Sequence, residues 1–231
     1  MHILFVEPDY YTKYPPLGLL KMSAYHKCEG DSTELVRGCK SVLRKPDRIY
    51  VTSLFTWAWK PVWHAVKHYK ELYPDADLWL GGLYASLLPD HAYLSGADSV
   101  YKGLFKEAED LMPDYGLIPS WDGSIIFSSR GCIRKCPFCA VPKLEGPLNS
   151  VKRSIKHLVY PGHRRIIFWD NNILASPRWT TVFDELEDLN LMVDFNQGLD
   201  ARLITDEVTE RLGKLRLDSN GGVKVRLGYD L

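Results

Sequence analysis

The stretch Ser129-Arg-Gly-Cys-Ile-Arg-Lys-Cys-Pro-Phe-Cys-Ala-Val-Pro142 holds three of the five cysteines of the chain, with the spacing Cys132-x3-Cys136-x2-Cys139. Three thiolates so close in sequence can bind one face of a small metal centre without help from the rest of the fold. A 4Fe–4S cluster normally takes four cysteine ligands, so a set of three leaves one iron open. An open iron can bind and activate a small molecule.

This spacing, with the aromatic Phe138 directly before the last cysteine, resembles the radical S-adenosylmethionine (SAM) superfamily. The resemblance implies that Cys132, Cys136 and Cys139 hold a 4Fe–4S cluster, and that the backbone around Phe138 contacts the SAM adenine. It also implies that the open iron chelates SAM. An electron from the cluster then yields methionine and a 5′-deoxyadenosyl radical, which abstracts hydrogen from a substrate.

Composition and charge indicate a soluble globular protein. Of 231 residues, 45% are apolar and 25% charged, which is ordinary for such proteins. Lys plus Arg equals Asp plus Glu, 29 each, so the net charge indicates no class of partner. No apolar run approaches the ~20 residues of a membrane span, and the start lacks the basic and apolar regions of a signal peptide. Clustered cysteines without a disulfide-like framework suit a reducing cytoplasm, where we expect the protein.

Residues 1–115 predict an α/β domain with a parallel sheet, because short apolar strands alternate with helices. Strands are predicted over 3–6, 34–37, 48–54, 77–82 and 97–101, and helices over 15–26, from 61 onward and over 104–112. In the second helix, the spacing of three and four residues predicts one buried stripe made of Val62, Val66, Tyr69 and Tyr73.

This half resembles the Rossmann-like cobalamin-binding domain of one branch of the superfamily, in Pro15-Pro16-Leu17-Gly18, Ser53-Leu54 and Gly81-Gly82. The resemblance implies that Gly81 and Gly82 contact the cofactor. One departure matters. The usual Asp-x-His-x-x-Gly, whose histidine ligates cobalt, should follow the second strand, but no histidine occurs in 36–40. Cobalamin therefore stays an open expectation, with a vestigial domain kept as a scaffold or substrate platform as the alternative.

Residues 116–123 belong to a segment rich in turn formers and predict a linker. Residues 124–231 predict the opening of a partial βα barrel, whose first strand, 124–127, delivers the cysteine loop at its carboxyl end. Further strands are predicted over 165–169, 192–195 and 223–227, and helices over 149–160, 179–189 and 205–212, the last with Thr205 as N-cap. These make about four βα units, whereas the family's partial barrel usually has six. We expect either a truncated chain or a minimal variant whose open edge a partner covers.

Polar residues follow two of these strands, where the resemblance places groups that face SAM and substrate. SAM carries an ammonium, a carboxylate and a sulfonium, so its site needs acceptor oxygens and a cation. Residues of the right kinds are Asp170, Asn172, Gln197 and Arg202. The simpler alternatives are that 170–172 is only a turn and that Arg202 is a solvated charge at a helix start. Residues 228–230 are expected at the end of the fourth strand.

Nine Lys and Arg lie between Arg130 and Arg165, against the single acid Glu145. Such a surface could receive an anionic substrate, such as tRNA or a phosphorylated metabolite, or an acidic reductant such as flavodoxin or ferredoxin. A solvated helix face is the simpler interpretation, and a nucleic-acid partner is not favoured. The sequence does not predict the substrate itself.

The sequence therefore predicts a radical SAM enzyme that performs methylation if cobalamin binds, or another C–H functionalisation if it does not. Arg130-Gly131 and residues 140–142 also resemble tRNA-modifying methylthiotransferases, but the first half lacks scattered cysteines for the second cluster of those proteins. A non-enzymatic iron–sulfur or zinc module, directed for example at nucleic acid, is the other alternative. Zinc needs a fourth ligand. The candidates are His157, His163, Cys28 and Cys39, and none of them belongs to a second Cys-x2-Cys or His-x3-His pair.

Overall fold

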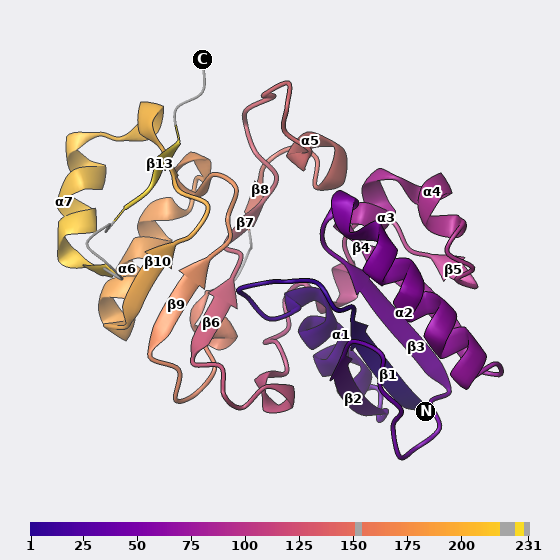
Figure 1. Cartoon of the computed structure of the whole chain (residues 1–231). Helices are drawn as coiled ribbons and strands as arrows, with labels where there is room; N and C mark the ends of the chain where they lie inside the picture. The colour runs from indigo at the N-terminus through magenta and orange to yellow at the C-terminus, as the bar shows by residue number, and fades with distance from the viewer. Residues whose placement is uncertain (151–153, 218–224, 229–231) are drawn as a thin grey trace. The chain divides into compact units, whose positions relative to one another are not determined.

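The computed structural model describes residues 1–150, 154–217 and 225–228. The chain forms two compact units, Met1–Pro119 and Ser120–Leu231, divided within the segment predicted as a linker. Each unit is an α/β structure with a parallel sheet (Figure 1). Within the described residues, no helix combines the length and the apolar character needed to cross a membrane.

The sheet of the first unit has the order β2-β1-β3-β4-β5, and every neighbouring pair is parallel. Its strands are β1 (His2–Glu7), β2 (Ser32–Arg37), β3 (Arg48–Ser53), β4 (Asp77–Gly82) and β5 (Ser99–Val100). The strand order reverses at β1, which creates the switch point where doubly wound sheets bind ligands at their carboxyl edge. The predicted Rossmann-like fold is confirmed.

Helices cover both faces of this sheet, so β1 is buried on both sides. Ile3 and Phe5 share a cluster with Leu19 of α1 (Leu17–Cys28). Leu4 and Val6 belong to the larger cluster on the other face, with α2 (Trp59–Leu72). The predicted stripe of α2 lies in that cluster: Val62, Val66, Tyr69 and, just past the helix end, Tyr73.

The rest of the unit is made of short pieces: η1 (Thr56–Ala58), α3 (Leu83–Leu87), α4 (Pro89–Tyr93), η2 (Lys106–Ala108) and η3 (Tyr115–Leu117). The helix predicted over 104–112 is wrong, because only η2 forms there. Contacts to α1 hold this segment in an irregular path. Lys21 Nζ donates to the carbonyl oxygen of Glu109 at 2.6 Å, and the backbone N–H of Asp114 donates to Leu20 O at 3.0 Å.

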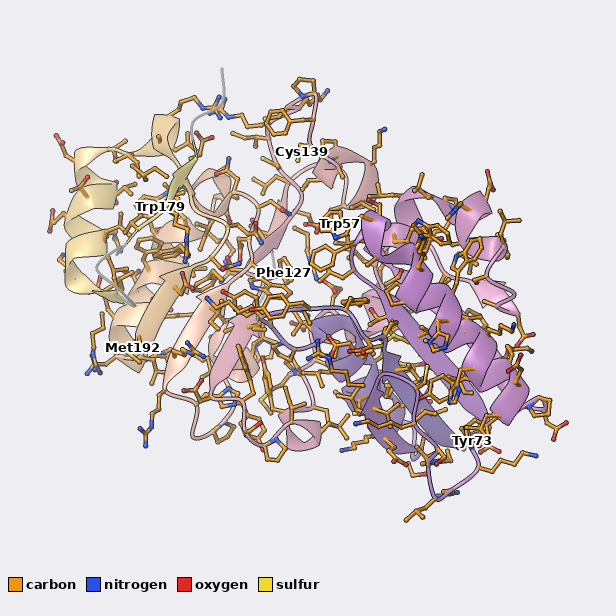
Figure 2. The ribbon with its side chains drawn as sticks, viewed as in Figure 1. Trp57, Tyr73, Phe127, Cys139, Trp179 and Met192 are labelled. Carbon is orange, nitrogen blue, oxygen red and sulfur yellow. The ribbon has the colours of Figure 1, made fainter. Side chains whose placement is uncertain are left out.

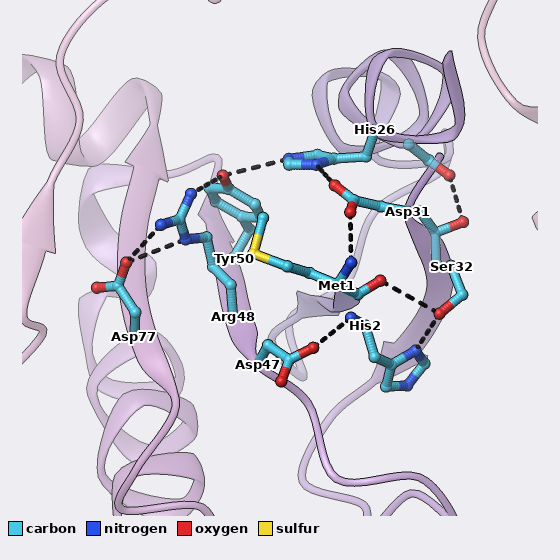
Figure 3. Close-up of polar contacts among 11 residues, drawn as sticks. Met1, His2, His26, Asp31, Ser32, Asp47, Arg48, Tyr50 and Asp77 are labelled. Atoms are coloured by element: carbon cyan, nitrogen blue, oxygen red, sulfur yellow. Dashed lines mark hydrogen bonds and ion pairs between the residues drawn. The ribbon is translucent and has the colours of Figure 1, made fainter. Parts of the chain in front are cut away.

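Polar side chains close the amino edge of the first sheet (Figure 3). Asp31 accepts from the Met1 ammonium at 2.6 Å and lies 2.8 Å from His26 Nδ1. These contacts hold the pKa of Asp31 below its usual range. Nearby, Arg48 Nε donates to Asp77 at 3.0 Å. The amino edge is thus occupied by the protein's own groups, opposite the carboxyl edge where such sheets bind ligands.

The sheet of the second unit has the order β12-β10-β9-β6, so its strands follow one another in chain order, all parallel. They are β6 (Gly123–Ile126), β9 (Arg165–Phe168), β10 (Met192–Phe195) and β12 (Arg216–Leu217). A parallel sheet wound in one direction is the opening of a βα barrel. The predicted partial barrel is confirmed as the fold of this unit.

Two helices complete the core of the second unit, α6 (Trp179–Leu189) and α7 (Asp206–Lys214). Phe183 of α6 and Val208 of α7 share one apolar cluster with Phe168 and Phe195 of the sheet. Helix α7 begins as predicted, since Thr205 Oγ1 accepts from the Val208 N–H at 3.3 Å. Shorter elements are β7 (Ser129–Arg130), α5 (Val141–Leu144), β8 (Asn149–Ser150), η4 (Lys156–Leu158), η5 (Ile173–Ala175), β11 (Leu199–Asp200), η6 (Ala201–Leu203) and β13 (Leu227–Gly228).

Two sequence predictions for this unit are wrong. The described part of 149–160 is not one helix: Asn149 and Ser150 pair with β7, and only η4 forms further on. The fourth strand of the sheet is β12, whereas β13 pairs with β11 in a separate ladder. Residues 151–153, 223–224 and 229–230, which these predictions include, lie outside the described residues.

Candidate functional site

The candidate site lies at the carboxyl edge of the second sheet, where the segments after β6, β9 and β10 meet. Ser128 follows β6, Asp170 and Asn172 follow β9, and Asp200 lies beyond β10 in β11. All four are buried. Parallel strands place the residues that follow them along one edge, which is why segments distant in sequence contact each other here.

Asp170 braces the segment that leads into the cysteine loop. Its carboxylate accepts from the backbone N–H of Ser128 at 2.9 Å, from Ser128 Oγ at 2.7 Å and from Ser129 Oγ at 2.6 Å. Burial raises the pKa of Asp170, while the hydrogen bonds from Ser129 and Ser128 act in the opposite direction. Its carboxylate oxygens are thus used to join the end of β6 to the end of β9. Its predicted contact with SAM stays a prediction.

The cysteine loop leaves and returns through a two-stranded ladder. Ser129 pairs with Ser150, and Arg130 with Asn149, in antiparallel register. Within the loop, Glu145 acts as a clamp: its Oε1 lies 3.2 Å from Arg130 Nη1, and its Oε2 accepts from the Gly131 N–H at 2.8 Å. Asn171 Nδ2 donates to the same Oε2 at 2.9 Å, which ties the loop to the end of β9.

The three cysteines are half-buried and carry free thiols. The backbone turns between the last two, because the Cys139 N–H donates to Cys136 O at 3.0 Å. Cys132 Sγ accepts from the Arg134 N–H at 3.3 Å and from Asn172 Nδ2 at 3.7 Å. Figure 2 shows Phe127 at the end of β6 and Cys139 on the loop beyond β7. Phe138 is 75% exposed.

Asp200 is the hub of the site. It accepts from Arg134 Nε at 2.9 Å, from Asn172 Nδ2 at 3.1 Å and from Arg202 Nε at 2.8 Å. Burial alone would raise its pKa, but the hydrogen bonds from Arg202, Arg134 and Asn172 outweigh this and lower the pKa of Asp200 to about 2. The carboxylate is therefore ionised at neutral pH, and it joins the cysteine loop to the segments after β9 and β10.

Asn172 supplies an unused acceptor. Its side chain is 3% exposed, and its Oδ1 is buried with no hydrogen-bond partner among the described residues. A buried amide oxygen without a donor costs about 1–3 kcal/mol. Such an atom beside the cysteine loop is the kind of group that a bound ligand with an N–H donor would satisfy.

The structure brings Asn172 and Arg202 together around Asp200, whereas Gln197 is exposed in the turn after β10. Sequence reasoning missed Asp200 and Glu145. The signal for Asp200 was an acid between the two candidate residues Gln197 and Arg202. The signal for Glu145 was its position as the single acid between Arg130 and Arg165, since a lone acid among cations is well placed to pair with one.

Several of those nine cations are paired. Arg130 contacts Glu145, Arg134 contacts Asp200, Lys156 contacts Asp188 and Arg165 contacts Asp122, at 2.9–3.2 Å. Lys152 and Arg153 lie outside the described residues. These pairs reduce the charge offered to an anionic partner, and the predicted partner surface stays a prediction.

In the first unit, the Gly81-Gly82 pair has an internal use. Gly82 has φ +102°, and a Cβ there would lie 2.5 Å from Ser53 O. Ser53 Oγ donates to Gly81 O at 2.6 Å. Tyr84 next to the pair is buried, with its hydroxyl bonded to Trp63 Nε1 at 3.0 Å and 2.6 Å from His91 Nδ1. Packing of β4 against β3 explains Gly82, and the predicted contact of Gly81 and Gly82 with cobalamin stays a prediction.

The cysteine loop fits a 4Fe–4S cluster by its donor chemistry, since it offers three free thiols and leaves one position for a ligand. In the described part of the chain, no three Cys, His, Asp or Glu side chains converge on a single-ion site.

No family model and no curated protein sequence matches the chain. Among solved structures it is similar to the radical S-adenosylmethionine methyltransferase TsrM from Kitasatospora setae, with tryptophan substrate and the SAM analogue aza-SAM bound. The TM-score is 0.65 at 13% identity, over 92% of this chain and 57% of that one. It is also similar to the cobalamin-dependent S-adenosylmethionine radical enzyme OxsB with aqua-cobalamin bound. There the TM-score is 0.61 at 15% identity, over 92% of this chain and 41% of that one.

The chain thus spans about half the length of these two neighbours. Similarity at these identities establishes the fold that the chain shares with them. It leaves activity, substrate and cofactors to be argued from the residues of the site.

Proposed function

We propose that this chain binds a 4Fe–4S cluster through Cys132, Cys136 and Cys139 and cleaves SAM reductively to start radical chemistry on a C–H bond. One observation carries the proposal. The loop with three free thiols begins at the carboxyl edge of a βα sheet and is bound to that edge through Asn172 and Asp200. The fold shared with two radical SAM enzymes supports it.

When bound, the cluster supplies the electron that cleaves SAM to methionine and a 5′-deoxyadenosyl radical. The chain's own residues bind and orient SAM. The buried Oδ1 of Asn172 accepts a hydrogen bond from the SAM ammonium. Arg134 and Arg202 both contact Asp200, and guanidinium groups at this edge of the sheet suit the SAM carboxylate. The backbone around the exposed Phe138 takes the adenine, and Gln197 contacts the substrate.

The proposal needs no cobalamin. One neighbour is cobalamin-dependent, and the other is a methyltransferase. In this chain, however, no histidine occurs in residues 36–40 at the end of β2, and Gly82 packs against the backbone of Ser53 in β3. We therefore limit the proposed reaction to SAM cleavage and hydrogen abstraction, with an electron from an acidic donor such as flavodoxin or ferredoxin.

Anaerobic reconstitution of the full chain with iron and sulfide, followed by SAM and dithionite, tests the proposal. We expect about four irons per chain, and both methionine and 5′-deoxyadenosine as products. The variants Cys132→Ala, Cys136→Ala and Cys139→Ala should each reduce product to the level found without protein, because each removes a ligand.

Cys28→Ala and Cys39→Ala are the matched controls, since they remove thiols of the first unit. Iron content and product should be unchanged in both. About eight irons per chain, with a loss in these controls, would favour a methylthiotransferase-like protein with a second cluster. Zinc in the purified protein, with no uptake of iron, would exclude the proposed enzyme.

A further inference from the structure

Cys132 differs from the other two cysteines of the loop in its hydrogen bonds. Its sulfur accepts from the Arg134 backbone N–H at 3.3 Å and from the Asn172 side-chain amide at 3.7 Å. In the described part of the chain, no hydrogen bond is donated to the sulfur of Cys136 or Cys139. One of the three thiols therefore has a distinct electrostatic environment, and a side chain from another element creates part of it.

The Asn172 amide is fixed in the orientation that donates to sulfur. Its Nδ2 also donates to Asp200 Oδ2 at 3.1 Å. A half-turn of the amide would place its Oδ1 against that carboxylate, and two acceptors would then face each other. Asp200 is held in turn by Arg134 and Arg202. The side chain keeps this orientation although it leaves Oδ1 without a partner, which indicates that the N–H groups set it.

A hydrogen bond to a cluster sulfur changes the reduction potential of the cluster. Reduction adds negative charge to the irons and their thiolates, and a donor N–H stabilises that charge. We propose that Asn172 is a positioning residue that raises the reduction potential of the cluster by donating to Cys132 Sγ, an inference that rests on the function proposed above. Asp200 holds the donating amide of Asn172 in place by accepting a second hydrogen bond from it.

The test is a redox titration of the reconstituted full chain, followed by electron paramagnetic resonance in the absence of SAM. Asn172→Leu removes the donor and keeps a similar volume. Its midpoint potential should become more negative by about the 59 mV that corresponds to a tenfold change in a one-electron equilibrium. Asn171→Leu is the matched control, because its amide contacts Glu145 and no cysteine. Its potential should equal that of the wild type.

The outcomes separate this inference from the proposed function. A wild-type chain that assembles no cluster overturns both. Full loading of Asn172→Leu with an unchanged potential overturns the inference alone, as do equal shifts in both variants, which would indicate a general disturbance of the loop. If Asn172→Leu does not load, Asn172→Ala is measured by the same criterion. Failure of both, with Asn171→Leu loaded, would assign Asn172 to cluster assembly and overturn its role in setting the potential.

Discussion

At the scale of single residues, Glu7 at the carboxyl end of β1 is a buried acid, and burial disfavours its charged form. Burial raises its pKa to about 7, although Arg37 at 3.9 Å acts in the opposite direction. The folded state therefore favours the protonated form. The stabilisation that the protonated Glu7 gives the folded state is complete below pH 4.5, the ordinary pKa of a glutamate. It is lost as the pH rises through about 7, the pKa of Glu7 in the folded state.

We expect Glu7→Gln to remove this pH dependence. At pH 8 its free energy of unfolding should exceed that of the wild type by up to roughly 3 kcal/mol, whereas at pH 4 the two should agree. Urea unfolding at both pH values measures this. Glu71→Gln, on the exposed side of α2, is the control and should match the wild type at both. A Glu7→Gln variant that is less stable than the wild type at pH 8 would contradict the assignment.

At the scale of elements, the cysteine loop depends on a close backbone approach at Gly131. This residue has φ +74°, and a Cβ there would overlap Pro147 O and lie 2.6 Å from Gly146 O. Gly146 has a similar φ of +76° but open space around its Cβ position. Alanine substitutions at Gly131 and Gly146 therefore separate the effect of the close backbone contact from the effect of the left-handed backbone conformation.

Gly131→Ala should open the base of the loop, while Gly146→Ala should show only the strain of a left-handed residue, about 1–2 kcal/mol. In the protein without a cluster, we expect a thiol reagent to modify Cys132 several-fold faster in Gly131→Ala than in Gly146→Ala. Iron content after reconstitution should fall in the same order. Equal rates in the two variants would show that the close approach does not hold the loop.

At the scale of the whole molecule, the core of the second unit forms without the cysteines. Its apolar cluster is built from the sheet, α6 and α7, and none of the three thiols belongs to it. Cys132→Ala should therefore change the free energy of unfolding of the cluster-free chain by less than about 1 kcal/mol. Phe183→Ala, which empties a fully buried position, should cost about 3–5 kcal/mol. Loss of folding in Cys132→Ala would instead indicate a metal-dependent module.

Predictions from sequence were accurate where the pattern is local. Helix α6 has the predicted bounds, because its apolar side chains recur at helical spacing over three turns. Most of the parallel strands were found for a similar reason, since they contain short apolar runs, whereas β12 was missed. The segment 149–160 was misread because Asn149 and Ser150 pair with residues 19 and 21 positions earlier, which no local pattern shows.

The candidate site was predicted in part for the same physical reason. Its three cysteines, the candidate ligands, stand in one short motif, so their spacing was visible in the sequence. Asp200 and Glu145 act through partners that the fold brings to them, and Arg134 and Asp200 are 66 positions apart. A lone acid acquires its role only when the strands place it beside its partners. The orphan oxygen of Asn172 could not be predicted at all, because it depends on the orientation of one amide.

The ladder between β7 and β8, together with the Glu145 clamp, has a consequence for the maturation of the protein. Both close the loop with the protein's own hydrogen bonds, so these contacts need no bound metal. If the proposed cluster binds, we expect its insertion to follow the folding of the second unit.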